Sequence, residues 1–250
     1  MAKGSNGDDS SFWTLAIETS VMTSSVALMD GLVVQAERTV RTARGHASKL
    51  LPMVEAILLE AKVSPQELGL IVVPVGPGSF TGIRIGISTA KGLGWSLGVP
   101  LVGVCSLESL AAGTGQRDIP VVSVLDARKG EVFMGAYQVG SEGRLDVLMS
   151  PIVAPPASAL EQVNEVLEGR GGVFVGEGIR AYPDTFADVS TLDPSWDVIR
   201  AVVMGRIGKE RFEQGGAASA EQLQPIYLRR SDAEIQVGLP TGTRKTVILE

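Results

Sequence analysis

Cysteine and histidine are almost absent from this sequence of 250 residues, which contains one of each, Cys105 and His46. A single cysteine excludes a disulfide within the chain, which favours a reducing compartment and predicts a cytoplasmic protein. Metal sites built from two or more imidazoles or thiolates are excluded for the same reason. We expect no bound metal and no catalytic residues. A Cys105–His46 nucleophile pair stays open as a minor alternative, but His46 fits better as a helix-start residue near an interface.

An excess of positive charge is also missing, since 22 basic residues face 28 acidic ones and the net charge is −6. A protein that holds nucleic acid alone usually carries a basic face. The local exception, Arg38 to Lys49, is interpreted as a solvated connector, with RNA contact as the alternative. The sequence has no apolar run long enough to span a membrane. Residues 1–11 lack the apolar segment of a signal peptide and are expected to form a flexible tail.

Aromatic residues make up only 5% of the chain, whereas hydrophobic residues reach 44% and glycine is frequent. This composition is typical of an α/β protein with an aliphatic core. Three strands, a helix, a strand and a helix are followed by much the same order again, which predicts two related α/β lobes. We assign residues 12–104 to the first lobe, 105–215 to the second, and 216–250 to a C-terminal segment. Its last part, 238–250, matches no motif.

Two predicted helices carry unusual surfaces. The helix over 46–62 has an apolar core stripe, yet Met53, Ala56 and Leu59 are expected on the opposite side, so it is buried on two sides or meets a partner. In the helix that follows the glycine-rich loop 76–82, four small residues recur at intervals of four and form a ridge of nearly bare backbone: Gly82, Gly86, Ala90 and Gly94. Another element packs closely on this ridge, either the chain's own sheet or a partner's helix.

The glycine-rich loop lies between a strand and a helix, where phosphates often bind. It is not a Walker A loop, because Gly82-Ile83-Arg84 replaces Gly-Lys-Ser/Thr, and its glycine spacing is not that of a Rossmann fingerprint. A tight strand-to-helix turn is therefore favoured over phosphate binding.

Several motifs occur together in a characteristic order: LAIETS, GHASKLLPMVEAIL, GPGSFTGIRIGISTAKGL, GVPLVGVCSLESLA, LDARKGEVF and PIYLR. On these motifs the chain, from about Leu15 to Arg229, resembles the TsaB (YeaZ) family. The resemblance implies a two-lobed fold of the actin, Hsp70 and sugar-kinase group, with ribonuclease-H-like lobes and a mixed sheet flanked by helices. It also implies a non-catalytic subunit of the machinery that makes the tRNA nucleoside N6-threonylcarbamoyladenosine (t6A).

The resemblance further implies the partners. These are the paralogous catalytic subunit TsaD, the ATPase TsaE and a second copy of the chain, with tRNA reached only through the complex. Pairing is expected through the two unusual helices, at His46, Leu50, Met53, Ala56, Gly82, Gly86 and Ala90. No tightly bound cofactor is expected. The candidate contacts for ATP or ADP, at the junction of the complex, are Thr19, Ser20, Gly76, Pro77, Gly78 and Ser79.

Departures from TsaD bear on activity. TsaD binds metal partly through HxxxH, and here Ser106 and Leu110 occupy the two histidine positions, neither of which can replace an imidazole. Glu18 stands where many relatives have aspartate, which puts inherited metal geometry in doubt. The alternatives are an ATPase of the actin-like group and a peptidase. The charged turn from Asp126 to Glu131 is interpreted as a solvated hairpin tip, with partner docking as the alternative.

Overall fold

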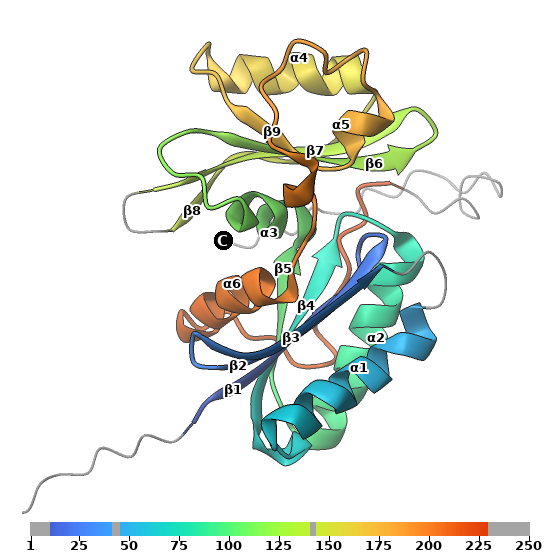
Figure 1. Cartoon of the computed structure of the whole chain (residues 1–250), viewed down its shortest axis with the longest axis vertical. Helices are drawn as coiled ribbons and strands as arrows, with labels where there is room; N and C mark the ends of the chain where they lie inside the picture. The colour runs from blue at the N-terminus through green and yellow to red at the C-terminus, as the bar shows by residue number, and fades with distance from the viewer. Residues whose placement is uncertain (1–10, 42–45, 141–143, 230–250) are drawn as a thin grey trace, which may run out of the picture.

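Two β-sheets lie one above the other, with helices between them and on both outer sides (Figure 1). The structure, a computed structural model, describes residues 11–41, 46–140 and 144–229, and for His46 only the backbone. The predicted N-terminal tail and the segment 238–250 therefore fall outside the described residues, except for residue 11.

The first sheet has the strand order β3-β2-β1-β4-β5. Its strands are β1 (Trp13–Glu18), β2 (Thr23–Asp30), β3 (Val33–Arg41), β4 (Leu68–Gly76) and β5 (Leu101–Cys105). The first three strands form the predicted antiparallel meander, and β4 and β5 run parallel to β1. The central strands β1 and β4 are buried on both faces, which explains their continuous apolar runs.

One face of the first sheet is covered by α1 (His46–Ala61) and α2 (Phe80–Leu97). At the start of α2, the Ser79 side chain accepts a hydrogen bond from the Gly82 amide at 3.2 Å. At its end, Gly98 adopts the left-handed conformation with φ 70°, as a helix C-terminus commonly requires. Between α1 and β4 there is one 3₁₀ turn (Pro65–Glu67).

The second sheet repeats the topology of the first. Its order is β8-β7-β6-β9, with β7 and β8 antiparallel neighbours and β9 parallel to β6. The strands are β6 (Val121–Arg128), β7 (Glu131–Val139), β8 (Leu145–Ala154) and β9 (Val173–Val175). The accompanying helices are α3 (Ser106–Gly113), α4 (Pro156–Leu167), α5 (Gly178–Ala181), a 3₁₀ turn (Pro194–Trp196) and α6 (Ala201–Glu213). This repetition of order and direction confirms the two related lobes predicted from the sequence.

The last helix, α6, returns to the first lobe. It packs on the face of the first sheet opposite α1 and α2. The approach is close: a Cβ atom placed on Gly208 would lie 2.5 Å from the Val72 side chain. The predicted range for the second lobe, 105–215, therefore extends too far. After α6, residues 216–229 form an extended segment, here called the strap. It pairs with β5 through Ala218 and Leu101.

The layers are α1/α2, first sheet, α6/α3, second sheet and α4. The central layer fills the space between the sheets with apolar side chains from both lobes, including Leu70, Leu107, Val121 and Met204. No helix in the described ranges combines the length and apolar character needed to cross a bilayer.

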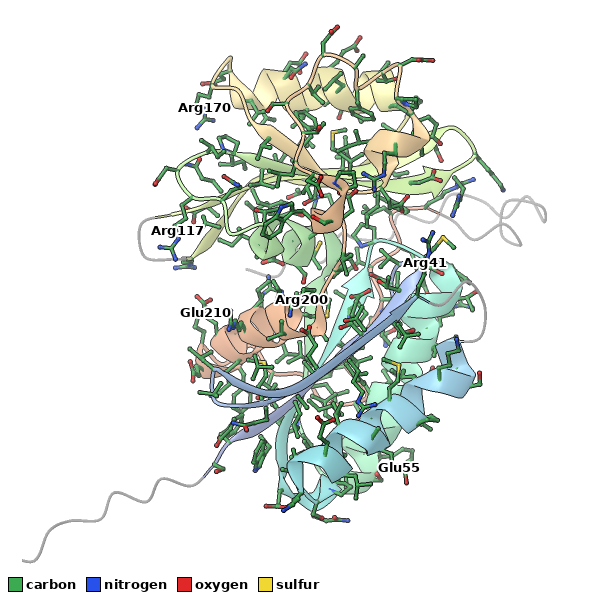
Figure 2. The ribbon with its side chains drawn as sticks, in the orientation of Figure 1. Arg41, Glu55, Arg117, Arg170, Arg200 and Glu210 are labelled. Atoms are coloured by element: carbon green, nitrogen blue, oxygen red, sulfur yellow. The ribbon has the colours of Figure 1, made fainter. Side chains whose placement is uncertain are left out.

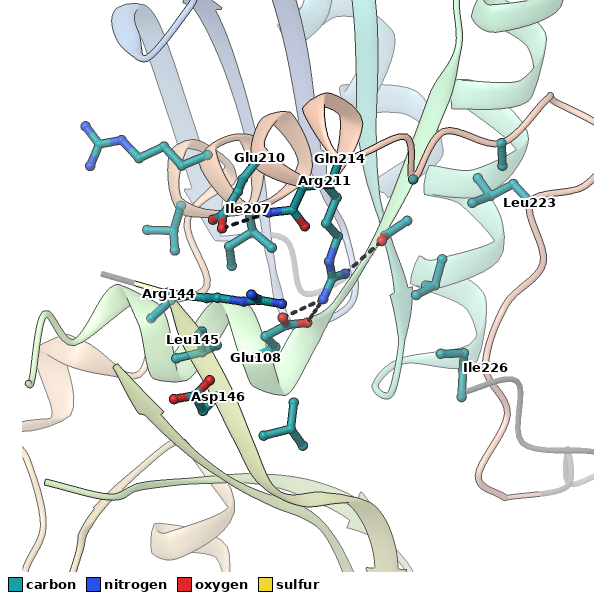
Figure 3. Close-up of a pocket in the computed structure, with 18 of the residues that line it drawn as sticks. Glu108, Arg144, Leu145, Asp146, Ile207, Glu210, Arg211, Gln214, Leu223 and Ile226 are labelled. Atoms are coloured by element: carbon teal, nitrogen blue, oxygen red, sulfur yellow. Dashed lines mark hydrogen bonds and ion pairs between the residues drawn. The ribbon is translucent and has the colours of Figure 1, made fainter. Parts of the chain in front are cut away.

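An ion pair joins the two central helices. The Glu108 carboxylate on α3 accepts two hydrogen bonds from the Arg211 guanidinium on α6, at 2.5 and 2.7 Å. The same guanidinium donates to the Gly103 carbonyl at 3.2 Å. The pair lies at one side of an open inter-lobe groove of about 1840 Å³ (Figure 3). Glu108 is nearly buried, so the pair is shielded from water on the carboxylate side.

We expect Glu108→Ala to lower the free energy of unfolding by about 2 kcal/mol, because it leaves the half-buried Arg211 charge without its carboxylate. Glu108→Ala combined with Arg211→Met should lose less than the single change, since no charge is then left unpaired. Urea denaturation of the three proteins measures this. Equal losses for the single and double variants would contradict it.

Candidate functional site

The loop after β1 is held together by hydrogen bonds between Glu18 and Ser20. Glu18 is fully buried, and its Oε1 accepts hydrogen bonds from the Ser20 amide at 2.5 Å and the Ser20 hydroxyl at 2.6 Å. Its Oε2 has no partner among the described residues. Burial raises the pKa of Glu18 to about 7, against the opposing hydrogen bonds from Ser20. This acid is thus held inside the fold and is not presented to a ligand.

The glycine-rich loop packs directly on the loop after β1. The Ser79 amide donates to the Ser20 carbonyl at 2.7 Å. A Cβ atom on Gly78, whose φ is +153°, would lie 2.3 Å from that same carbonyl oxygen. The backbones of the two loops are therefore in direct contact at Gly78 and Ser20.

This contact argues against the predicted nucleotide contacts. Thr19 and Ser20 are fully buried, and the Thr19 hydroxyl donates to the Gly82 carbonyl at 2.8 Å. Gly76 and Pro77 are buried as well, while Gly78 is half-buried and Ser79 exposed. None of these six residues lines the described inter-lobe groove. That these residues hold ATP or ADP stays a prediction, and the internal hydrogen bonds of Thr19, Ser20 and Ser79 do not favour it.

The ridge of small residues on α2 faces the chain itself. Gly82, Gly86, Ala90 and Gly94 are all buried. A Cβ atom would lie 2.0 Å from the Thr19 carbonyl oxygen if placed on Gly82, and 2.4 Å from the Thr19 hydroxyl if placed on Gly86. The sequence left two explanations open: the ridge packs either on the chain's own sheet or on a partner's helix. The structure supports the first, because the ridge lies on the first sheet and the loop after β1. Gly82, Gly86 and Ala90 therefore cannot meet a partner helix.

The first helix also needs correction. Leu50 and Met53 are buried beneath α1 in the core of the first lobe, so they are not interface residues. Ala56 is half-buried. The His46 side chain lies outside the described residues. The outer side of α1 is instead formed at intervals of four by Ala47, Leu51, Glu55 and Leu59, and Figure 2 shows Glu55 on this side.

Together, the outer sides of α1 and α2 expose large apolar side chains. The exposed fractions are 53% for Leu51, 78% for Leu59 and 84% for Trp95. On α2, Ser88 and Gly92 lie between Ile85 and Trp95 and are exposed, so the helix backbone is accessible there. We call this surface the α1/α2 face; it comprises Ala47, Leu51, Glu55, Leu59, Thr81, Arg84, Ile85, Ser88, Thr89, Gly92 and Trp95. Apolar residues of this size concentrated on neighbouring helices are typical of a protein-binding surface.

The two positions that the sequence comparison with TsaD singled out are occupied by core side chains. Ser106 and Leu110 are buried in α3. Beside them, burial raises the pKa of the Cys105 thiol to about 11, with the Glu108 carboxylate adding to the effect. Cys105 contacts the Tyr137 hydroxyl at 3.7 Å. A thiol with so high a pKa is a poor nucleophile, which disfavours the Cys105–His46 pair.

The charged turn between β6 and β7 is structured. Arg128 and Lys129 both have positive φ, at 64° and 54°. The Asp126 carboxylate accepts a hydrogen bond from the Arg128 amide at 2.7 Å and forms an ion pair with its guanidinium at 2.9 Å. From the strap, Arg229 donates to the Ala127 carbonyl at 2.8 Å. The turn is thus fixed by hydrogen bonds within the chain and is more than a solvated hairpin tip.

The fold and these sealed loops define the class of protein. Each lobe has a mixed sheet flanked by helices, and the strand order β8-β7-β6-β9 of the second sheet repeats the order β3-β2-β1-β4 of the first, so this is a two-lobed α/β protein.

Comparisons with known proteins identify the family. The family model for TsaD, tRNA N6-adenosine threonylcarbamoyltransferase, matches residues 40–237. The TsaB proteins of Bacillus subtilis and Escherichia coli are 34% and 33% identical to the chain, covering 88% of it and 95% of each relative. YeaZ from Pseudomonas aeruginosa has a TM-score of 0.75 at 30% identity, over 86% of this chain and 100% of that one. The chain belongs to the TsaB (YeaZ) family of tRNA threonylcarbamoyladenosine biosynthesis proteins.

The contact between α2 and the loop after β1 can be tested with two glycines of the same helix. Gly82→Ala should lower the free energy of unfolding by about 2 kcal/mol or more, because the new methyl group meets the Thr19 carbonyl. Gly92→Ala is the matched control: its Cβ meets nothing within 4 Å, so it should be neutral or stabilise by up to about 1 kcal/mol. Thermal and urea melts measure both. Equal effects at the two positions would contradict the packing.

Glu18 should make stability depend on pH. Its folded pKa of about 7 exceeds the ordinary 4.5, so between those values only the folded state retains the proton. Stability should therefore fall as the pH rises from 4.5 through 7, by up to about 3 kcal/mol, and then level off. Glu18→Gln should remove this component and be the more stable protein at pH 8. The exposed Glu165→Gln is the control, and denaturant melts from pH 5 to 8 provide the comparison.

Proposed function

We propose that this chain is a non-catalytic subunit of a threonylcarbamoyl transferase complex, which binds and supports the catalytic subunit TsaD together with the ATPase TsaE. The complex transfers threonylcarbamoyl to the adenosine adjacent to the anticodon. The observation that carries the proposal is the α1/α2 face, with Leu51, Leu59 and Trp95 exposed on neighbouring helices.

The sealed loops favour this role over the ATPase alternative. An ATPase of the actin-like group needs acidic and glycine-rich loops open to phosphate, and here Glu18 is internal and Gly78 lies against Ser20. The peptidase alternative lacks support as well, because Ser106 and Leu110 are buried at the positions of the TsaD ligands. In the part of the chain that the structure describes, no three His, Cys, Asp or Glu side chains are grouped to hold a metal.

Shared ancestry supports pairing with TsaD. Because the TsaD family model matches most of this chain, the two subunits share a fold, and equivalent helices can pack together about a pseudo-twofold axis. The same face can pair two copies of this chain, so a homodimer and the complex with TsaD should compete. In this proposal the chain contacts tRNA only as part of the complex, and the complex works in the cytoplasm. Any ATP or ADP is bound by the partner subunits.

The direct test is reconstitution of t6A formation on tRNA from purified TsaD and TsaE, with and without this chain. Formation should depend on the chain, and the chain alone should show no transferase or hydrolase activity. Full modification without it would overturn the proposal.

Charge placed on the α1/α2 face should prevent pairing without harming the fold. We expect Leu59→Glu and Trp95→Glu each to weaken TsaD binding at least about tenfold, since each places a charge on an apolar surface that would lose its water on binding, and Trp95 also belongs to the residue type that most often dominates such interfaces. Both should melt within about 2 °C of the unsubstituted protein, because neither side chain is buried. Val147→Glu on β8, where Val147 is 53% exposed, is the control for an exposed apolar residue elsewhere. Normal binding by both α1/α2-face variants would remove this face from the interface.

A further inference from the structure

Arg84, at the start of the α1/α2 face, is held in place by two aromatic rings. Its guanidinium lies 3.8 Å from the centroid of the Phe80 ring, one helical turn earlier. Its Nε donates a hydrogen bond to the Tyr227 hydroxyl at 2.8 Å. The two rings lie against each other, with centroids 5.1 Å apart. One helix and the strap thus combine to fix a single exposed arginine.

The strap itself is anchored on both sides of Tyr227. The adjacent Ile226 amide donates to the Val75 carbonyl on β4 at 2.8 Å, and Leu223 is buried in the core of the first lobe. Two residues later, Arg229 donates to the Ala127 carbonyl of the second lobe. The Tyr227 hydroxyl is therefore a fixed acceptor. The orientation of Arg84 is set before any partner binds, which reduces the entropy lost on binding.

The terminal nitrogens of Arg84 are left for another group. Arg84 is exposed, and in the described part of the chain no carboxylate pairs with it. It borders a shallow depression of about 450 Å³ between α1 and α2. The other residues of this depression carry no charge: Ala47, Phe80, Thr81, Ile85, Ser88 and Thr89. A planar guanidinium with its two terminal nitrogens open matches the two oxygens of a carboxylate.

We propose that Arg84 receives a carboxylate side chain from a helix of the catalytic partner seated in this depression, and that it determines the specificity of docking. This rests on the function proposed above. Among the residues that line the depression, Arg84 carries the one positive charge, and the others are apolar or bear a hydroxyl group. One carboxylate of a partner protein would neutralise that charge. An RNA backbone or a nucleotide phosphate would usually meet several positive groups. Tyr227 is the positioning residue, because it holds Arg84 without contacting the partner.

The test measures TsaD binding to the full chain at several salt concentrations. Arg84→Gln should weaken binding about 10- to 100-fold, the size expected for a charge-assisted hydrogen-bonded pair at an interface. It should also flatten the dependence of affinity on salt. Arg84→Lys retains the positive charge but lacks the two parallel N–H donors of the guanidinium, so its affinity for TsaD should lie between that of Arg84→Gln and that of the unsubstituted chain. Arg117→Gln is the control, because it removes an exposed arginine far from the α1/α2 face (Figure 2).

Tyr227→Phe keeps the ring and removes only the hydroxyl that holds Arg84. It should weaken binding several-fold in the unsubstituted chain and have no further effect when Arg84 is already glutamine. A merely structural strap would give additive losses, and that result would overturn the positioning role.

Unchanged binding by Arg84→Gln, or complete rescue by Arg84→Lys, would overturn the carboxylate proposal while leaving the proposed function in place. If the unsubstituted chain does not bind TsaD, both the carboxylate proposal and the proposed function are contradicted. Loss of binding by Leu59→Glu alongside normal binding by Arg84→Gln would show that the face is correct and the arginine is not part of it.

Discussion

The close approach of α2 to the loop after β1 is the contact on which the rest of the structure depends. Gly82 and Gly86 leave no room for a side chain between the helix and Thr19. The Thr19 hydroxyl also donates to the Gly82 carbonyl. Because α2 lies so close, the glycine-rich loop that precedes it is drawn onto Ser20, and the ends of β1 and β4 are covered by protein.

The two sides of α2 therefore serve different purposes. The row of small residues at 82, 86, 90 and 94 allows tight packing on the chain's own sheet and loop. The neighbouring row carries Arg84, Ile85, Ser88 and Trp95 to the surface. The close packing on one side also fixes the position of the helix, so that its other side forms a rigid exposed surface. The same packing thus buries one side of α2 and leaves the other side exposed.

Much of this fold could be predicted from sequence because its signals are local. The hairpin at Asp30-Gly31, the buried strands and the repeated order of elements depend on turn chemistry and periodicity, which one sequence displays directly. The orientation of α1 could not be predicted in this way. Apolar residues occupy most of its circumference, so assigning Leu51 to the core and Met53 to the surface was as consistent with periodicity as the opposite arrangement observed.

The small-residue ridge posed a different problem. Glycines at intervals of four require close packing, but they do not say whether the neighbour belongs to the same chain. Only the position of Thr19 decides it. Arg84 was missed because its role depends on Tyr227, 143 residues away in the sequence, and no local pattern links the two.

The strap connects the proposed docking surface to both lobes. It pairs with β5 at Ala218, contacts β4 at Ile226 and reaches the β6–β7 turn at Arg229. The strap thus contacts the turn that contains Arg128 and Lys129, both with positive φ, and through Tyr227 it also holds Arg84. A rotation of one lobe against the other would have to stretch or release this segment. The half-buried Glu108–Arg211 pair and the apolar layer between the sheets oppose such a rotation. The two lobes and the α1/α2 face are accordingly expected to act as one rigid unit, which suits the proposed role of holding a partner in place.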